Sequence, residues 1–212
     1  MTGLIFDLDG TLANSIPYII QTAQAVFRQL GKEFTDEEII QYIGVPLLQT
    51  GEELLGPGRG QEYTDAYMRR YAESGFCPEP FPGVKDMLDS LTRAGAKIAL
   101  CTSKRREPAH KNLKMMQIDR YFPVIVNSES GYGAKPDPGP ALGAAKELGL
   151  PPAECIFIGD SIHDIACGNR ARMATVGVTW GASDEATLKS VNASHICRDV
   201  PELTGFLLKR LS

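Results

Sequence analysis

The stretch Leu4-Ile5-Phe6-Asp7-Leu8-Asp9-Gly10-Thr11-Leu12 decides the fold of this chain. It opens with a short apolar run and ends abruptly in two acids and a Gly-Thr pair. That pattern is typical of a buried strand that runs into a functional turn. The sequence therefore predicts a first β-strand that presents Asp7 and Asp9 at its carboxyl end.

Further apolar runs alternate with segments of helical spacing along the rest of the chain. The predicted strands are Lys97–Thr102, Val124–Val126, Cys155–Ile158 and Thr175–Val178, and the predicted helices are Val84–Arg93, Arg105–Met116, Pro140–Leu148 and Ile162–Arg172. Strands that alternate with helices form a parallel sheet covered on both faces. We therefore expect an α/β protein with a Rossmann-like, doubly wound parallel sheet.

Residues 14–80 break this alternation, because they show helical periods only. Thr35-Asp36-Glu37-Glu38 has the form of a capping box, which predicts a helix that continues through Ile43. The segment is too long for an ordinary connection between a strand and a helix. We expect an α/β core domain of residues 1–13 and 81–212, with an inserted helical cap domain of residues 14–80.

Composition narrows the classes of function. The 212 residues carry 22 basic and 26 acidic side chains, a net charge of −4. The chain therefore has no overall positive charge that would attract a nucleic-acid backbone. No apolar run approaches the roughly 18 residues of a membrane span, and the first residues do not form a basic leader. Five cysteines stand singly, which indicates a reducing compartment. We expect a cytoplasmic protein that binds neither membrane nor nucleic acid.

Polar residues follow the predicted strands, and ligands of doubly wound sheets bind outside the carboxyl ends of the strands. Besides Asp7 and Asp9, these residues are Thr102-Ser103-Lys104, Ala134-Lys135-Pro136 and the run from Gly159-Asp160-Ser161 to Asp164. Pro136 is expected to begin the next helix and to leave Lys135 at a loop tip. The sequence thus gathers acids, hydroxyls and a lysine at one edge of the sheet.

Carboxylates that share one edge repel one another, and a hard cation relieves that repulsion. Magnesium is the natural candidate, because it prefers oxygen ligands and shares its shell with phosphate. One of Asp7 and Asp9 can attack phosphorus while the other handles a proton. Thr102 and Lys135 can bind phosphoryl oxygens. Asp160 and Asp164 can serve the metal or its waters, although either could instead cap a helix.

Together these stretches resemble the four motifs of the haloacid dehalogenase superfamily, and residues 14–80 resemble its small cap domain. The resemblance implies that Asp7 is the nucleophile that becomes aspartyl phosphate and also a magnesium ligand. Asp9 would be the general acid and base, with its main-chain carbonyl on the metal. Thr102 and Lys135 would hold the phosphoryl group. Asp160 would be a direct metal ligand, with Asp164 a further ligand or a support through water.

The resemblance also narrows the reaction. Ile43-Gly44-x-Pro46-Leu47 and Val178-Thr179-Trp180-Gly181 look like phosphoglycolate phosphatases and the related pyrophosphatases. Asp9 argues against the dehalogenases and phosphonate hydrolases of the superfamily, and Ile19 and Leu47 stand where phosphohexose mutases carry a histidine and a basic residue. The implied protein is a monomeric or homodimeric magnesium-dependent phosphatase of a small phosphorylated metabolite. Phosphoglycolate is the first candidate, pyrophosphate the alternative, and sugar phosphates follow. Its expected substrate contacts are Thr11, Ser103 and Gly44.

Other interpretations remain open at this point. A receiver-type signalling module also pairs a phosphate-accepting aspartate with magnesium, although Asp9 and the helical insert favour an enzyme. An inactive scaffold is a third possibility, against which the complete acid set argues. Arg59 could reach a substrate carboxylate or face solvent. A basic stretch could be a solvated helix face or a local field for an anionic substrate; it consists of Lys104, Arg105, Arg106, His110, Lys111 and Lys114.

Overall fold

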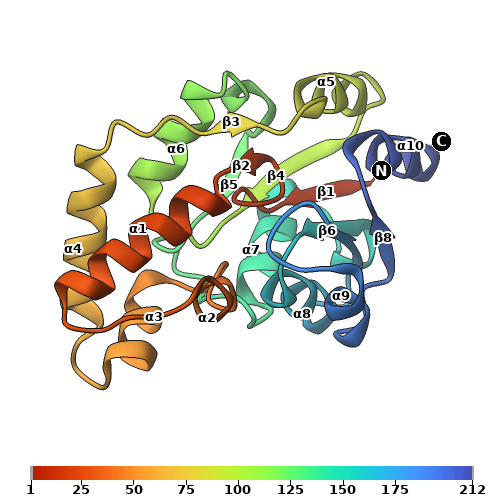
Figure 1. Cartoon of the computed structure of the whole chain (residues 1–212). Coiled ribbons are helices and arrows are strands. Elements are labelled where there is room, and N and C mark those ends of the chain that lie inside the picture. The colour runs from red at the N-terminus through yellow and green to blue at the C-terminus, as the bar shows by residue number, and fades with distance from the viewer. Residues whose placement is uncertain (1, 212) are drawn as a thin grey trace.

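The computed structural model describes residues 2–211 and centres on a six-stranded sheet (Figure 1). The strand order is β5-β4-β1-β6-β7-β8, and every neighbouring pair is parallel. The strands are β1 (Gly3–Phe6), β4 (Lys97–Cys101), β5 (Val124–Val126), β6 (Cys155–Gly159), β7 (Ala174–Val178) and β8 (His195–Cys197). The predicted α/β fold with a doubly wound parallel sheet is confirmed.

Strand β1 lies at the centre of the sheet and is buried along its whole length. Its side chains alternate between the two faces, as they do in any strand. Leu4 and Phe6 belong to one apolar cluster, and Ile5 belongs to a second. A strand covered on both faces needs apolar residues at every position, which explains the uninterrupted run Leu4-Ile5-Phe6.

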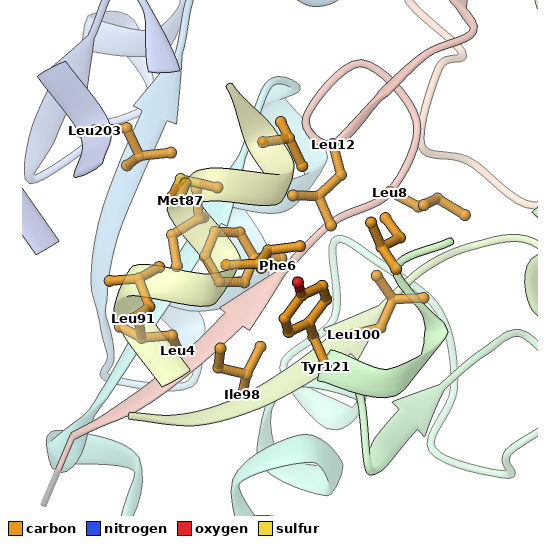
Figure 2. Close-up of a cluster of buried hydrophobic side chains, with 14 of the residues drawn as sticks. Leu4, Phe6, Leu8, Leu12, Met87, Leu91, Ile98, Leu100, Tyr121 and Leu203 are labelled. Carbon is orange, nitrogen blue, oxygen red and sulfur yellow. The ribbon is translucent and has the colours of Figure 1, made fainter. Parts of the chain in front are cut away.

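Figure 2 shows the first of these clusters, in which Phe6 packs with Met87 and Leu91. Leu203 lies against the same group of side chains. The helices of this face are α5 (Val84–Arg93), α6 (Arg106–Met115) and α10 (Val200–Leu211), while α7 (Gly139–Leu148) and α8 (Ile162–Arg170) cover the opposite face. The short elements α9 (Glu185–Ser190), η1 (Asp119–Tyr121) and η2 (Pro152–Glu154) complete the core. Helices on both faces hold β1 rigidly, so that the residue after Phe6 has a fixed position.

Helices α1 (Ile16–Gln29), α2 (Asp36–Ile40), α3 (Leu47–Leu55) and α4 (Gly60–Glu73) lie between β1 and α5 in the chain. They form an apolar cluster of their own, in which Phe27 stacks on Tyr63. The chain leaves and re-enters the core through a two-stranded antiparallel pair, β2 (Ala13–Asn14) and β3 (Glu79–Pro80). The division into core and cap at residues 14 and 80 stays a prediction, which this separate cluster favours.

The predicted helices Val84–Arg93, Arg105–Met116, Pro140–Leu148 and Ile162–Arg172 agree with the structure to within two residues, but the end of α2 and the expected role of Pro136 differ. The capping box at Thr35 is present, but α2 ends at Ile40 instead of continuing through Ile43. Tyr42, Ile43 and Val45 each donate a backbone hydrogen bond to the residue three positions earlier, which tightens the chain into turns. Pro136 does not begin a helix: α7 begins at Gly139, and the Lys135–Pro136 peptide bond is cis.

Three elements near the end of the chain, β8, α9 and α10, were not predicted. Strand β8 is a three-residue edge strand with only one fully buried side chain, Cys197, so its apolar signal is weak.

None of the helices within residues 2–211 combines the length with the apolar composition that crossing a bilayer would require.

Candidate active site

The carboxyl end of the sheet holds a buried cluster of three acids and one lysine. Asp7 directly follows β1, Asp160 follows β6, and Asp164 lies in the first turn of α8. Lys135 comes from the loop between β5 and α7. All four side chains are almost fully buried, and a carboxylate oxygen of each acid lies within 4.8 Å of the other two. The structure therefore brings together four of the residues predicted from separate stretches of sequence.

Lys135 joins two of these acids. Its Nζ lies 2.6 Å from Asp7 Oδ1 and 2.6 Å from Asp164 Oδ1. Burial alone would lower the pKa of Lys135, but the charges of Asp164 and Asp7 outweigh burial and raise that pKa well above its ordinary value. Lys135 is therefore a permanent positive charge beside Asp7.

Asp160 is fully buried and held by two donors. Thr11 Oγ1 donates to its Oδ1 at 2.9 Å, and the Ala182 N–H donates to its Oδ2 at 2.8 Å. A side-chain carbon at Gly10 or Gly181 would lie 2.1 Å or 2.3 Å from Asp160 Oδ2, so both positions need glycine. Thr11 thus orients Asp160. Thr11 was expected to contact the substrate, but it is not among the residues that line the cavity described below.

Asp164 makes two sets of contacts, one within its own helix and one with Lys135. It completes a capping box at the start of α8, in which its Oδ2 accepts from the Ser161 N–H at 3.1 Å and its N–H donates to Ser161 Oγ at 3.2 Å. Its other oxygen accepts from Lys135. The cap therefore fixes the side chain that Lys135 pairs with, so Asp164 belongs both to the helix and to the acid cluster.

Three acids against one lysine leave excess negative charge in a buried place. Burial raises the pKa of Asp7 from 3.8 to about 7, and the charges of Asp164 and Asp9 add to that effect while Lys135 opposes it. Burial, with Asp164 and Asp7, also raises the pKa of Asp160 well above its ordinary value. A divalent cation would offset this charge, and carboxylate oxygens are the ligands that a hard cation prefers. The residues present therefore fit a divalent cation.

The charge imbalance predicts how stability depends on pH. Asp7 in the folded protein retains, between pH 3.8 and about 7, a proton that the unfolded chain releases, so its contribution to stability is lost as the pH rises through that window. In the presence of a chelator, the change in melting temperature from about pH 5 to about pH 8 should therefore be more negative in the wild type than in Asp7→Asn, which has no carboxyl group to titrate at this position. Mg²⁺ should raise the melting temperature of the wild type more at about pH 8 than at about pH 5. Scanning calorimetry checks both expectations. A rise in melting temperature with Mg²⁺ that is the same at both pH values would contradict the second. Asp160→Asn should reduce the rise that Mg²⁺ produces.

Asp9 lies outside this cluster and faces the cavity. Ser15 Oγ donates to Asp9 Oδ1 at 2.6 Å, and Lys104 Nζ lies 2.7 Å and 2.6 Å from the two carboxylate oxygens. The Lys104 and Asp9 side chains are only 13% and 14% exposed. Burial alone would lower the pKa of Lys104, but the charge of Asp9 outweighs it and raises that pKa. Within the basic stretch, Lys104 thus turns inward, while Lys111 and Lys114 are exposed.

A cavity of about 510 Å³ separates these core residues from helices α1 to α4. Asp7, Asp9, Thr102 and Lys135 line its core side, together with Ser103 and Lys104. The side chains from residues 14–80 that line it are apolar, aromatic or neutral polar, and include Ile19, Tyr42, Gly44, Thr50, Gln61, Tyr63, Tyr67 and Tyr71. Every charged group of the described lining therefore comes from the core.

Two core side chains contact the turn after α2. Ser103 Oγ donates to the Gly44 carbonyl oxygen, and His163 Nε2 lies 3.0 Å from the Gln41 carbonyl oxygen. Gly44 has a φ of +91°, and a side chain there would come within 3.0 Å of Ser161 Oγ. Ser103 and Gly44, both expected to contact substrate, thus line the cavity and bind each other. Arg59 pairs with Glu62 at 2.7 Å and is not among the residues that line the cavity.

The sequence profile of one family, described as haloacid dehalogenase-like hydrolase, matches residues 4–178. This chain belongs to the haloacid dehalogenase-like hydrolases. A pyrophosphatase PpaX of Halalkalibacterium halodurans is 33% identical over 94% of this chain and 94% of its own. A phosphoglycolate phosphatase of Aquifex aeolicus is 30% identical over 85% of this chain and 86% of its own. The crystal structure of a hydrolase from Pseudomonas syringae superposes with a TM-score of 0.89 at 27% identity, covering 99% of both chains.

Membership of the haloacid dehalogenase-like hydrolases confirms the resemblance stated from the motifs, and with it the prediction of a phosphatase of this superfamily. Sequence reasoning did not find the bonds that hold the site residues, namely Ser15 and Lys104 on Asp9 and the Ala182 N–H on Asp160. Gly181, the residue before Ala182, was a signal for the contact between the Ala182 N–H and Asp160, because a glycine lets the backbone approach another group closely. Nothing local marked the contact between Lys104 and Asp9.

Proposed function

We propose that this haloacid dehalogenase-like hydrolase is a Mg²⁺-dependent phosphatase that works through an aspartyl phosphate on Asp7. The observation that carries the proposal is the position of the Asp7 carboxylate, which reaches the cavity wall while Lys135 and the buried acids surround it. A carboxylate there can meet a phosphoryl group that enters from the cavity. The cation would be held by the side chains of Asp7, Asp160 and Asp164 and by the main-chain carbonyl of Asp9.

Two displacements complete the reaction. In the first, an Asp7 oxygen forms a bond to phosphorus as the bond to the leaving oxygen breaks, and Asp9 gives that oxygen a proton. In the second, Asp9 takes a proton from water, whose oxygen attacks phosphorus and releases Asp7 and inorganic phosphate. Thr102 and Lys135 bind the phosphoryl oxygens throughout. Mg²⁺, when bound, supplies positive charge that offsets the carboxylates and polarises the phosphoryl group.

Two substrates are supported by the relatives of this chain. The relatives named pyrophosphatase favour pyrophosphate, and the one named phosphoglycolate phosphatase favours 2-phosphoglycolate. The motifs around Gly44 and Trp180 resemble those of phosphoglycolate phosphatases and the related pyrophosphatases, so 2-phosphoglycolate is the first candidate and pyrophosphate the second. Both substrates are small, and neither requires a nucleic acid, a membrane or a second protein. The monomeric or homodimeric state and the cytoplasmic location stay predictions.

The test is a comparison of kcat/KM for 2-phosphoglycolate, pyrophosphate, hexose phosphates and nucleoside monophosphates, with Mg²⁺ and with a chelator. We expect hydrolysis only with the cation and the highest kcat/KM for one of the first two substrates. Activity that is indifferent to the chelator would contradict the magnesium proposal. A preference for hexose phosphates would contradict the substrate proposal and leave the reaction type intact.

Asp9 provides a separate prediction. Asp9→Asn should lower kcat for p-nitrophenyl phosphate by about 10²-fold to 10⁴-fold, which is the usual contribution of a general acid–base group. Steady-state kinetics would measure this, with Asp65→Asn on the exposed face of α4 as the control. An Asp9→Asn enzyme with wild-type kcat would show that another group moves the proton.

A further inference from the structure

The side chain of Lys104 has a fixed direction, because the chain around it is held on both sides. Its N–H donates to Thr102 Oγ1 at 3.2 Å, and its carbonyl oxygen accepts from the Ser128 N–H at 3.0 Å and from Ser128 Oγ at 3.2 Å. These bonds anchor Lys104 between the end of β4 and the loop after β5. The side chain therefore leaves a rigid part of the core and enters the cavity.

Lys104 lies between Asp9 and the helices that cover the cavity. Its ammonium group contacts both oxygens of Asp9 and lies 5.6 Å from the centre of the Tyr71 ring of α4. An ammonium group has three N–H donors, and the Asp9 carboxylate accepts at most two of them in this arrangement. One donor thus remains for another acceptor on the leaving-group side of Asp9.

No other cation is equally placed among the described residues that line the cavity. Lys135 is occupied by Asp7 and Asp164 at the phosphoryl end. Arg105 pairs with Glu129 at 2.8 Å, and its side chain is 52% exposed. The residues of α1 to α4 that line the cavity add no charge. A negative charge carried by the leaving group would therefore meet Lys104 first.

We propose that Lys104 is a specificity-determining residue that binds a second anionic group on the substrate while it contacts Asp9. The inference rests on the proposed phosphatase function and narrows its substrate class. The substrate carries a carboxylate or a second phosphate close to the scissile oxygen, as 2-phosphoglycolate and pyrophosphate both do. Neutral leaving groups of the same size bind without this contact.

The test uses the whole protein with Mg²⁺ and three substrates: 2-phosphoglycolate, pyrophosphate and ethyl phosphate. Ethyl phosphate has the carbon chain of phosphoglycolate without its carboxylate, so it serves as the matched neutral substrate. Lys104→Met should lower kcat/KM about 10-fold to 100-fold for at least one of the two anionic substrates, which is the worth of a hydrogen bond between charged groups. The substrate that loses more identifies the carboxylate or the phosphate as the group that is bound.

Because 2-phosphoglycolate and ethyl phosphate both release an alcohol, an effect of Lys104 through Asp9 applies to both, and the ratio of kcat/KM between these two substrates isolates the second anion. That ratio should fall in Lys104→Met, mainly through KM, and recover in part in Lys104→Arg. Lys111→Met, which removes an exposed lysine of α6, should leave the ratio unchanged. Equal losses on all three substrates, or no loss, would overturn the inference and leave the phosphatase proposal standing.

A binding measurement covers the case in which the variants turn over too slowly. In the Asp7→Asn background, adding Lys104→Met should weaken the binding of 2-phosphoglycolate or pyrophosphate, measured as Kd by calorimetry, and should leave the Kd of ethyl phosphate unchanged. An unchanged Kd for both anionic ligands would overturn the inference. If the wild type hydrolyses none of the three substrates, the substrate proposal falls and the inference falls with it, whereas hydrolysis of another phosphate ester would leave the phosphatase reaction intact.

Discussion

Asp7→Asn should abolish the hydrolysis of p-nitrophenyl phosphate, with a loss of about 10⁴-fold to 10⁶-fold in kcat, the scale on which loss of an enzyme's nucleophile acts. An amide oxygen does not attack phosphorus as a carboxylate does, so no covalent intermediate can form. The fold should survive, because Lys135 keeps its contact with Asp164 at 2.6 Å. Steady-state kinetics with a melting curve would separate the two effects.

The matched control for Asp7 is Asp137→Asn, which removes a carboxylate that is 77% exposed in the loop that carries Lys135. It should keep wild-type kcat. Substantial turnover by Asp7→Asn would contradict the covalent mechanism. A wild-type phosphoprotein that persists for minutes after the substrate is removed would instead favour a receiver-type signalling module, because Asp9 is expected to hasten hydrolysis.

Lys135→Met should destabilise the protein by about 3–5 kcal/mol at neutral pH in a chelator, because it leaves the buried Asp7 and Asp164 without their counter-charge. The loss should be smaller near pH 5, where the raised pKa of Asp7 allows that carboxyl to take up a proton. Mg²⁺ should restore part of the stability but not the activity, because the phosphoryl group loses a donor. Urea unfolding at both pH values, with and without the cation, measures each effect.

Lys146→Met removes an exposed lysine of α7 and serves as the control. It should change the free energy of unfolding by less than about 0.5 kcal/mol, as surface substitutions usually do. A Lys135→Met variant as stable as this control would show that the acid cluster does not depend on the lysine.

The sequence predicted those residues of the candidate site that stand at the carboxyl ends of apolar runs. Asp7, Asp9, Thr102 and Asp160 each follow an apolar run, and parallel strands bring such positions to one edge of the sheet. The same reasoning failed for the extent of α2, because the turn after it is held by contacts with Ser103 and His163. The helical signal around Ile43 is local, whereas those contacts come from the core.

The sequence by itself determined the strands of the large sheet up to β7, the helices α5 to α8 between them, and the chemical types at the strand ends, since all three depend on residues that are neighbours in the chain. Only the tertiary structure decided what each site residue touches. Lys104 and Asp9 are 95 positions apart and Lys135 and Asp7 are 128 apart, so their contacts exist only once the sheet has assembled. The physical reason is that a side chain's direction follows its local backbone, while its partner depends on how the whole chain packs.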